Sequence, residues 1–185
     1  AREAPYAPDL HLRLAELYSC HGSSEESGNW WRFPDHVSND YSDTRGAPGH
    51  DYLTGLARGH KLGAIASSDS HSLIPGFAGM TCVRTGALTR EGVWDALWRR
   101  DCYATTGARI LLEFRIGRAR MGRNSYLAAG APVVAEVRAH GTEVIDALEL
   151  VRDGNVVATL APGALDVFHS FPLASFSGDS GWVYA

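Results

Sequence analysis

The sequence predicts an α/β fold followed by a small β-sandwich, and three observations lead to this prediction. Residues 1–107 mix helical and strand patterns in an order typical of α/β layered or barrel architectures. From about residue 108 the apolar residues recur with a period of two, which is typical of strands. Within that part, the Asp-Gly pair of Arg152–Asn155 favours a tight hairpin turn. We therefore predict two domains, 1–107 and 108–185, the second resembling an immunoglobulin-like sandwich.

The first domain contains several local sequence patterns that predict strands, helices and a loop. Apolar residues alternate over Arg13–Ser19, which predicts a strand, and residues 22–50 are rich in Gly, Ser, Asn, Asp and Pro, which predicts a long loop. Asp51–Arg58 shows helical spacing, with a glycine directly after it as the C′ residue. Leu62–Ala66 is a small apolar run suited to a buried strand. A second helix is predicted over 89–100, with threonine as its N-cap and a glutamate in its first turn.

The second domain is predicted from short runs that are rich in β-branched and aromatic residues. Such runs, separated by turn residues, are typical of a sandwich of antiparallel strands. They are Ile110–Ile116, Val133–Ala139, Ala147–Val151, Val156–Leu160, Asp166–Phe171 and Gly181–Tyr184.

Composition narrows the function classes. The chain has 185 residues, of which 45% are hydrophobic and 21% charged, values typical of a folded globular protein. Its net charge of −4 argues against a nucleic-acid partner, because nucleic-acid binders usually carry a basic face. No apolar stretch approaches the roughly 18 residues of a membrane helix, so no membrane partner is predicted. The chain does not begin with Met, and we expect it to be a fragment. Oligomeric state and compartment, bacterial cytoplasm or periplasm, stay open.

The sharpest chemical feature is Ser67–His71, directly after the predicted strand Leu62–Ala66. Asp69 and His71 are two residues apart, so in an extended segment their side chains point to the same side. Functional residues collect at strand ends in α/β folds, and Asp with His suits zinc, manganese or iron. Spacing alone also fits a capped turn without any metal.

A second polar segment follows the first predicted strand. His21 and the hydroxyls of Ser23 and Ser24 are candidates for lining a polar pocket, and Gly22 allows close backbone approach. The alternative is a serine-rich turn with an exposed histidine. A serine hydrolase is disfavoured because the chain lacks the G-x-S-x-G elbow.

Together these segments resemble a known family. Residues 56–71 resemble the last metal motif of the polymerase and histidinol phosphatase (PHP) superfamily. Residues 15–25 and 88–110 resemble its bacterial branch catalogued as domain of unknown function 3604. The resemblance is close over residues 12–123 and looser through the β-rich remainder.

The resemblance implies the C-terminal part of a PHP-type (β/α)7 barrel that hydrolyses phosphoesters with divalent metal ions (Mn, Zn or Fe). It assigns Asp69 and His71 as catalytic metal ligands and places His21 near a metal. It places the substrate near a set of polar side chains, which are Ser19, His21, Ser23, Ser24 and Ser68. The opening His-x-His motif and the middle ligands of the superfamily are absent from these residues, so the implied metal site is incomplete.

Two functions from different classes follow. The first is part of a metal-dependent hydrolase, acting on a small-molecule phosphoester through a metal-bound hydroxide and inactive as this fragment alone. The second is a non-catalytic binding module, with a degenerate barrel and a sandwich that contacts a partner or a glycan.

Overall fold

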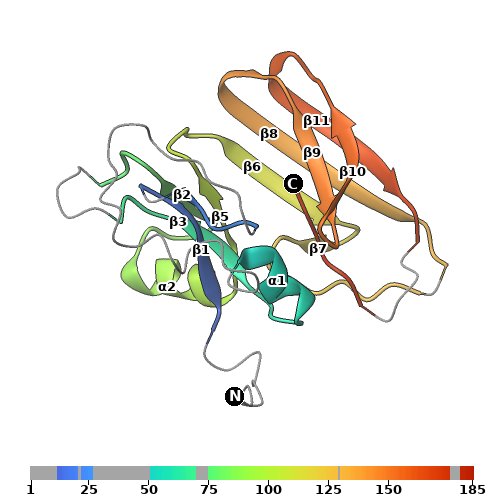
Figure 1. The fold of residues 1–185 in the computed structure, drawn as a ribbon, viewed down its shortest axis with the longest axis horizontal. Coiled ribbons are helices and arrows are strands. Elements are labelled where there is room, and N and C mark those ends of the chain that lie inside the picture. Colours follow the sequence, from blue (N-terminus) through green and yellow to red (C-terminus); the bar gives the residue numbers. More distant parts are fainter. Residues whose placement is uncertain (1–11, 21, 27–50, 70–74, 129, 176–179) are drawn as a thin grey trace. The chain divides into compact units, whose positions relative to one another are not determined.

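The computed structural model describes residues 12–20, 22–26, 51–69, 75–128, 130–175 and 180–185. Strands account for 46% of the described residues and two short helices for 11%. The chain divides into two compact units, unit 1 (Ala1–Gly107) and unit 2 (Ala108–Ala185) (Figure 1). Within the described ranges, neither helix is long and apolar enough to cross a membrane.

The described residues of unit 1 form two small sheets and two helices. In the first sheet β1 is central, pairing antiparallel with β2 and parallel with β3. In the second sheet β4 pairs antiparallel with β5. The elements of unit 1 are β1 (Leu14–Ser19), β2 (Gly22–Ser23), α1 (Tyr52–Ala57), β3 (Gly63–Ala66), β4 (Met80–Val83), α2 (Arg90–Trp98) and β5 (Cys102–Thr105).

The predicted α/β fold with a (β/α)7 barrel is wrong. Such a barrel needs parallel strands joined through helices, but the described strands form separate sheets and close no barrel. The connection through α2 shows why. It joins β4 to β5, which run antiparallel, whereas a crossover helix in a barrel joins parallel neighbours. Among the described strands, β1 and β3 are the one parallel pair.

Local end signals place both helices as the sequence predicts. Thr89 is the N-cap of α2, and its hydroxyl accepts a hydrogen bond from the Gly92 amide at 3.0 Å. Asp51 caps α1 in the same way, accepting from the Thr54 amide at 2.7 Å. Gly59 follows α1 with φ +89, the left-handed conformation expected of a C′ glycine.

Side-chain contacts tie the two sheets of unit 1 together. The Thr81 hydroxyl on β4 donates to the Ala66 carbonyl at 2.7 Å and accepts from the Ala66 amide at 3.0 Å. Thr81 thereby satisfies both backbone groups of the last residue of β3. Gly79 packs against Ser67, the residue directly after β3. A Cβ atom at position 79 would lie 2.8 Å from the Ser67 carbonyl oxygen, so a larger residue does not fit there without a shift. The C-terminal end of β3 is therefore held from one side by β4 and the segment before it.

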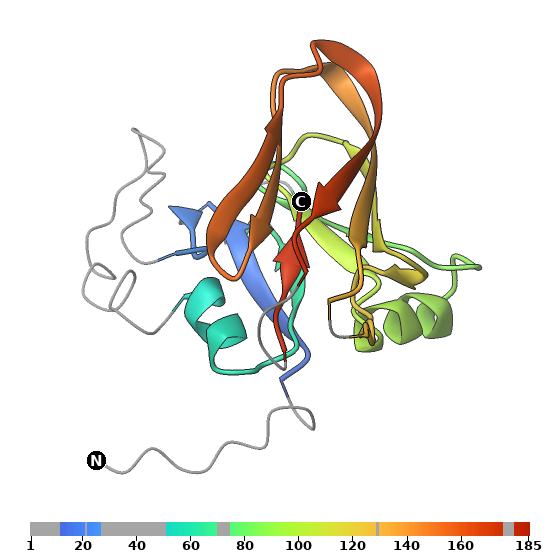
Figure 2. The same cartoon turned by 90° about the vertical axis from the view of Figure 1, so that its right-hand side faces the viewer.

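The described strands of unit 2 form two antiparallel sheets, which are seen as separate layers in Figure 2. The four-stranded sheet has the order β11-β8-β6-β7, and the three-stranded sheet has the order β10-β9-β12. The strands are β6 (Leu111–Ile116), β7 (Ala119–Arg120), β8 (Val133–Ile145), β9 (Leu148–Arg152), β10 (Asn155–Leu160), β11 (Ala164–Leu173) and β12 (Val183–Tyr184). Each predicted run from residue 110 onward overlaps one of these strands.

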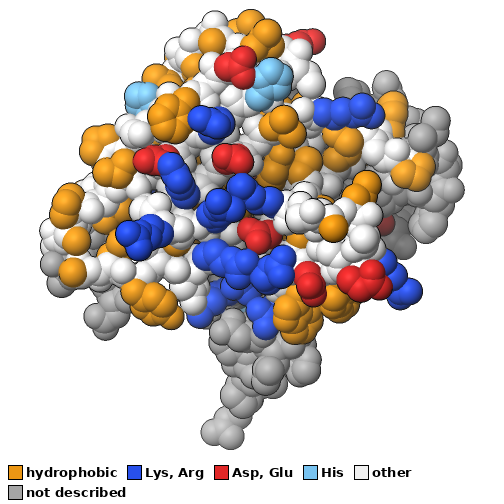
Figure 3. All heavy atoms as spheres, turned by 180° about the vertical axis from the view of Figure 1, so that it is seen from behind, with side chains coloured by type: hydrophobic (Ala, Val, Ile, Leu, Met, Phe, Trp, Pro, Cys, Tyr) orange, Lys and Arg blue, Asp and Glu red, His pale blue; other side chains and the backbone are white. Residues whose placement is uncertain are grey.

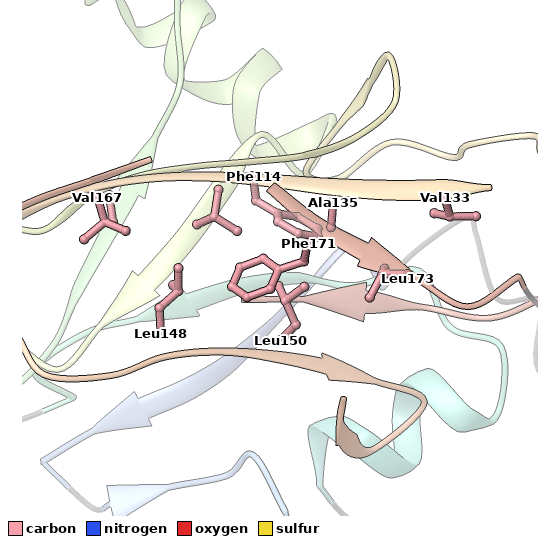
Figure 4. Close-up of a cluster of buried hydrophobic side chains, with 10 residues drawn as sticks. Phe114, Val133, Ala135, Leu148, Leu150, Val167, Phe171 and Leu173 are labelled. Carbon is pink, nitrogen blue, oxygen red and sulfur yellow. The ribbon is translucent and has the colours of Figure 1, made fainter. Parts of the chain in front are cut away.

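The core of unit 2 lies between its sheets, as Figure 4 shows. Leu148 and Leu150 of β9 meet side chains from the four-stranded sheet, among them Phe114 and Phe171. Along β8 the inward residues are buried and the outward ones mostly exposed, which is the period-two pattern read from the sequence. The predicted hairpin turn joins β9 to β10, where Asp153 has φ 49 and Gly154 has φ 81. An Asp-Gly pair fits there because two consecutive positive φ angles define this turn type.

We predict that Leu150→Ala destabilises unit 2 by about 3 kcal/mol, because a fully buried leucine loses its transfer free energy and leaves a cavity. Val156→Ala is the control, since Val156 is 54% exposed in the neighbouring strand, and its cost should stay below about 1 kcal/mol. Urea denaturation of the variants measures both values. Equal losses would contradict the core assignment.

A second prediction concerns the buried thiol of Cys102. Burial, aided by the Asp101 carboxylate, raises the pKa of this thiol from 9.0 to about 11. Above pH 9 the unfolded thiol ionises while the folded one stays neutral, so folding stability falls as the pH rises from 9 to about 11. The loss should approach about 2–3 kcal/mol. Comparing denaturation of the wild type and Cys102→Ala across this range isolates the contribution. An identical pH dependence in both proteins would refute it.

Candidate functional site

The candidate site lies where β1 and β3 end. Because these strands are parallel, their C-terminal ends meet at one edge of the sheet. Backbone hydrogen bonds continue just past the paired residues: the Ser67 amide donates to the Tyr18 carbonyl at 3.1 Å, and the Cys20 amide donates to the Ser68 carbonyl at 3.2 Å. Segments 49 residues apart in sequence are thus fastened side by side. We call Glu16, Cys20, Ser67, Ser68 and Asp69 the strand-end cluster.

Within the strand-end cluster, one hydroxyl is engaged by a carboxylate. Ser67 Oγ donates to Glu16 Oε1 at 2.5 Å, which joins the residue directly after β3 to β1 through side chains. Hydrogen bonds to ionised acceptors are stronger than neutral ones, so this contact orients both groups. The sequence alone does not indicate this contact, because only the parallel register brings position 16 near position 67.

Asp69 has an unusual backbone. Its φ is 42, in the left-handed region that non-glycine residues rarely adopt, although Asp and Asn tolerate it better than most. Cys20 Sγ donates to the Asp69 carbonyl oxygen at 3.4 Å, and the Asp69 residue is exposed. Strained backbone of this kind often occurs at functional sites. The contact through Cys20 was not anticipated from the sequence.

The predicted substrate-binding serines have different surroundings. Ser19 is buried, with 6% of its surface exposed, and Ser68 is partly buried. Ser23 Oγ accepts from the Glu25 amide at 3.3 Å, so this hydroxyl serves the turn that follows β2. The Ser24 carbonyl accepts from the Tyr52 amide at 2.9 Å, where α1 begins. A role in substrate binding stays a prediction for all four serines.

The metal prediction is open because His21 and His71 lie outside the described residues. Asp69 is therefore the one predicted metal ligand whose position is described. In the described part of the chain, no group of three or more His, Cys, Asp and Glu side chains is arranged to hold a metal ion. The grouping of Asp69, His71 and His21 stays a prediction.

Other surface features lie apart from the strand-end cluster. A shallow groove runs along α2 and the residues before it, between Leu88 and Leu97, and includes no residue of the cluster. On the face shown in Figure 3, Lys and Arg side chains are interspersed with Asp, Glu and hydrophobic ones. Burial raises the pKa of the Tyr18 phenol, and the Cys20 thiol raises it further.

Comparisons with known proteins place the chain in context. It is 30% identical over 183 residues to an uncharacterized protein of Chlamydia pneumoniae, covering 88% of this chain and 28% of that protein. It is 30% identical over 167 residues to an uncharacterized protein of Chlamydia muridarum, covering 81% of this chain and 26% of the relative. The chain thus spans little more than a quarter of the length of these relatives. No solved structure matches it significantly.

A family model also matches the chain directly. The match covers residues 66–142, beginning at the last residue of β3 and including Ser67, Ser68, Asp69 and His71. The family is described as "Protein of unknown function (DUF3604)". This match supports the assignment of the chain to the DUF3604 family.

Proposed function

We propose that the strand-end cluster forms part of a site for metal-dependent hydrolysis of a small-molecule phosphoester. The observation that carries the proposal is the pairing of β1 with β3, which brings the Asp69 segment beside Cys20 at the C-terminal strand ends. The reaction type, metal-dependent phosphoester hydrolysis, is inferred from the resemblance of residues 56–71 to a metal motif of the PHP superfamily. The proposal does not include the barrel that this superfamily usually has.

The chain's own groups would take distinct roles. Asp69 offers an exposed carboxylate on a backbone held by Cys20. Glu16 orients the Ser67 hydroxyl at the rim of the same edge. The proposal adds His21, which follows Cys20 in sequence, and His71, two residues after Asp69. Imidazole and carboxylate together suit manganese, zinc or iron.

The described residues alone do not fit a metal centre. A catalytic metal needs about three protein ligands and an open position, and no group of three donors is present within the described ranges. Further ligands would have to come from His21, His71 and residues beyond those described. A divalent ion in such sites acts as a Lewis acid and lowers the pKa of bound water.

A second candidate function follows from the small number of metal-donor side chains among the described residues. If Asp69 and its neighbours hold no metal, the chain is a non-catalytic binding module, and unit 2 contacts a partner or a glycan. Metal content separates the two candidates directly, since a hydrolase of this kind should purify with bound transition metal whereas a binding module should not.

We predict that Asp69→Asn lowers metal-dependent phosphoesterase activity of the complete gene product by roughly a hundredfold or more. Asparagine removes the charge but tolerates the left-handed backbone at position 69, so the turn should persist. The measurement is hydrolysis of an aryl phosphate and of a phosphodiester with Mn²⁺ or Zn²⁺ supplied, followed by chelation. The 185-residue chain alone should be inactive, since it lacks the superfamily's other ligands.

Asp95→Asn is the matched control. This carboxylate is also exposed, lies on α2 and forms an ion pair with Arg99 at 3.9 Å on the helix surface. Its loss should leave activity unchanged and stability within about 0.5 kcal/mol. A complete gene product without bound metal and without turnover would reject the hydrolase and support the binding module. Chelator-resistant turnover by the 185-residue chain would contradict the proposal as well.

A further inference from the structure

The sheet edges of unit 2 are protected unequally. An open edge exposes unpaired backbone groups to another strand, and proteins usually keep such edges short, bulged or charged. Strands β7 and β12 have two residues each, and the pairing of β10 shifts register between Val156 and Ala158. By contrast, β11 runs in unbroken register with β8 from Asp166 to Leu173. Among the described strands, β11 pairs with β8 alone.

The amino-acid composition of β11 does little to prevent the strand from pairing with another strand. Lys61 is the one lysine of the whole sequence, so no lysine guards this edge. Pro172 stands near the C-terminal end of the strand, and Asp166 is its one charged residue, apart from the titratable His169. At its middle, Phe168 is 62% exposed on the face that points away from the core. A long, regular edge with an exposed aromatic side chain is a template for pairing with another strand.

The outward face around Phe168 is ordered by cross-strand contacts. The Arg138 guanidinium on β8 lies 5.5 Å from the centre of the Phe168 ring. On one side, His140 Nδ1 lies 2.5 Å from Asp166 Oδ1. On the other side, Ser170 is opposite Glu136, which is paired with Arg115 of β6. These charges are paired within the sheet, which leaves Phe168 as the exposed apolar group at the middle of the edge.

We propose that β11 pairs antiparallel with β11 of a second copy of this chain, about a two-fold axis at Phe168. This arrangement places the two Phe168 rings side by side across the new strand pair. Antiparallel aromatic pairs of this kind stabilise neighbouring strands. It also continues the four-stranded sheet of one copy into that of the other, so the open backbone groups of both edges are paired.

Charge favours a second copy in this orientation. About a two-fold axis at Phe168, Asp166 lies opposite Ser170 of the other copy, so no carboxylate faces another. A parallel pairing in equal register would instead place Asp166 beside its own counterpart, which is unfavourable. Of the two pairings in equal register, the antiparallel one therefore avoids this repulsion, and it is the arrangement that a closed two-fold dimer requires.

The first test compares Phe168→Lys with Leu111→Lys. Leu111 is 64% exposed on the same outward face but lies on β6, separated from β11 by β8. Both variants remove an exposed apolar group, so both should fold, as circular dichroism can confirm. In sedimentation equilibrium, the wild type and Leu111→Lys should dimerise reversibly. Phe168→Lys should weaken the dimer at least about tenfold, because two lysines then meet at the axis.

The second test fixes the register. Ser170→Asp puts a carboxylate opposite Asp166 of the other copy at two symmetric places, and we expect a three- to tenfold weaker dimer, on the order given by like charges across strands. Ser170→Lys puts an ammonium group there and should keep or tighten the dimer. Because each substitution is at an exposed position, a difference between these two variants reports the pairing rather than the fold.

Hydrogen exchange supplies an independent readout. Amide protection of residues 166–171 should rise with protein concentration in the wild type and not in Phe168→Lys. A wild-type chain that stays monomeric up to about 1 mM would overturn the proposal, since weaker association is not specific binding. A dimer that Phe168→Lys leaves intact, or one whose protection appears elsewhere, would overturn it too.

Discussion

The parallel pairing of β1 with β3 is the contact on which the candidate site depends. Parallel neighbours need a long connection, and α1 lies in the connection between these two strands. The polar groups of the cluster lie directly after these strands, apart from Glu16, which lies within β1. Thr81 and Gly79, on β4 and directly before it, contact the end of β3 as well. The segment that leads to Asp69 therefore begins at a residue whose backbone is fixed by several contacts.

What could be predicted from the sequence was local. The threonine cap of α2 and the Asp-Gly turn after β9 act within a few residues, and each is found where the sequence predicts it. The period-two pattern of unit 2 is equally local, because alternation reports which face of a strand is buried. Such signals do not depend on which strand becomes the neighbour.

The overall architecture could not be predicted in this way, because strand direction is a long-range property. The run from β4 through α2 to β5 has the alternation of a β-α-β unit, yet Met80 pairs with Thr105 and Val83 with Cys102, which is antiparallel. No residue in that segment marks the difference. The same limit applies to the site: Ser67 meets Glu16, and Cys20 meets the Asp69 carbonyl, only through the register of a parallel pair. The position of Asp69 in sequence was informative, whereas its surroundings were not.

The backbone at Asp69 bears on why a carboxylate is there. At φ 42, glycine pays no steric cost and asparagine is tolerated as well as aspartate, so the turn by itself does not select a charged side chain. Nor does burial select it, because the residue is exposed. Neither conformation nor burial therefore accounts for the negative charge at this position. Aspartate differs from glycine and asparagine, which also fit the turn, in its charge, and the proposed function would use that charge to bind a cation.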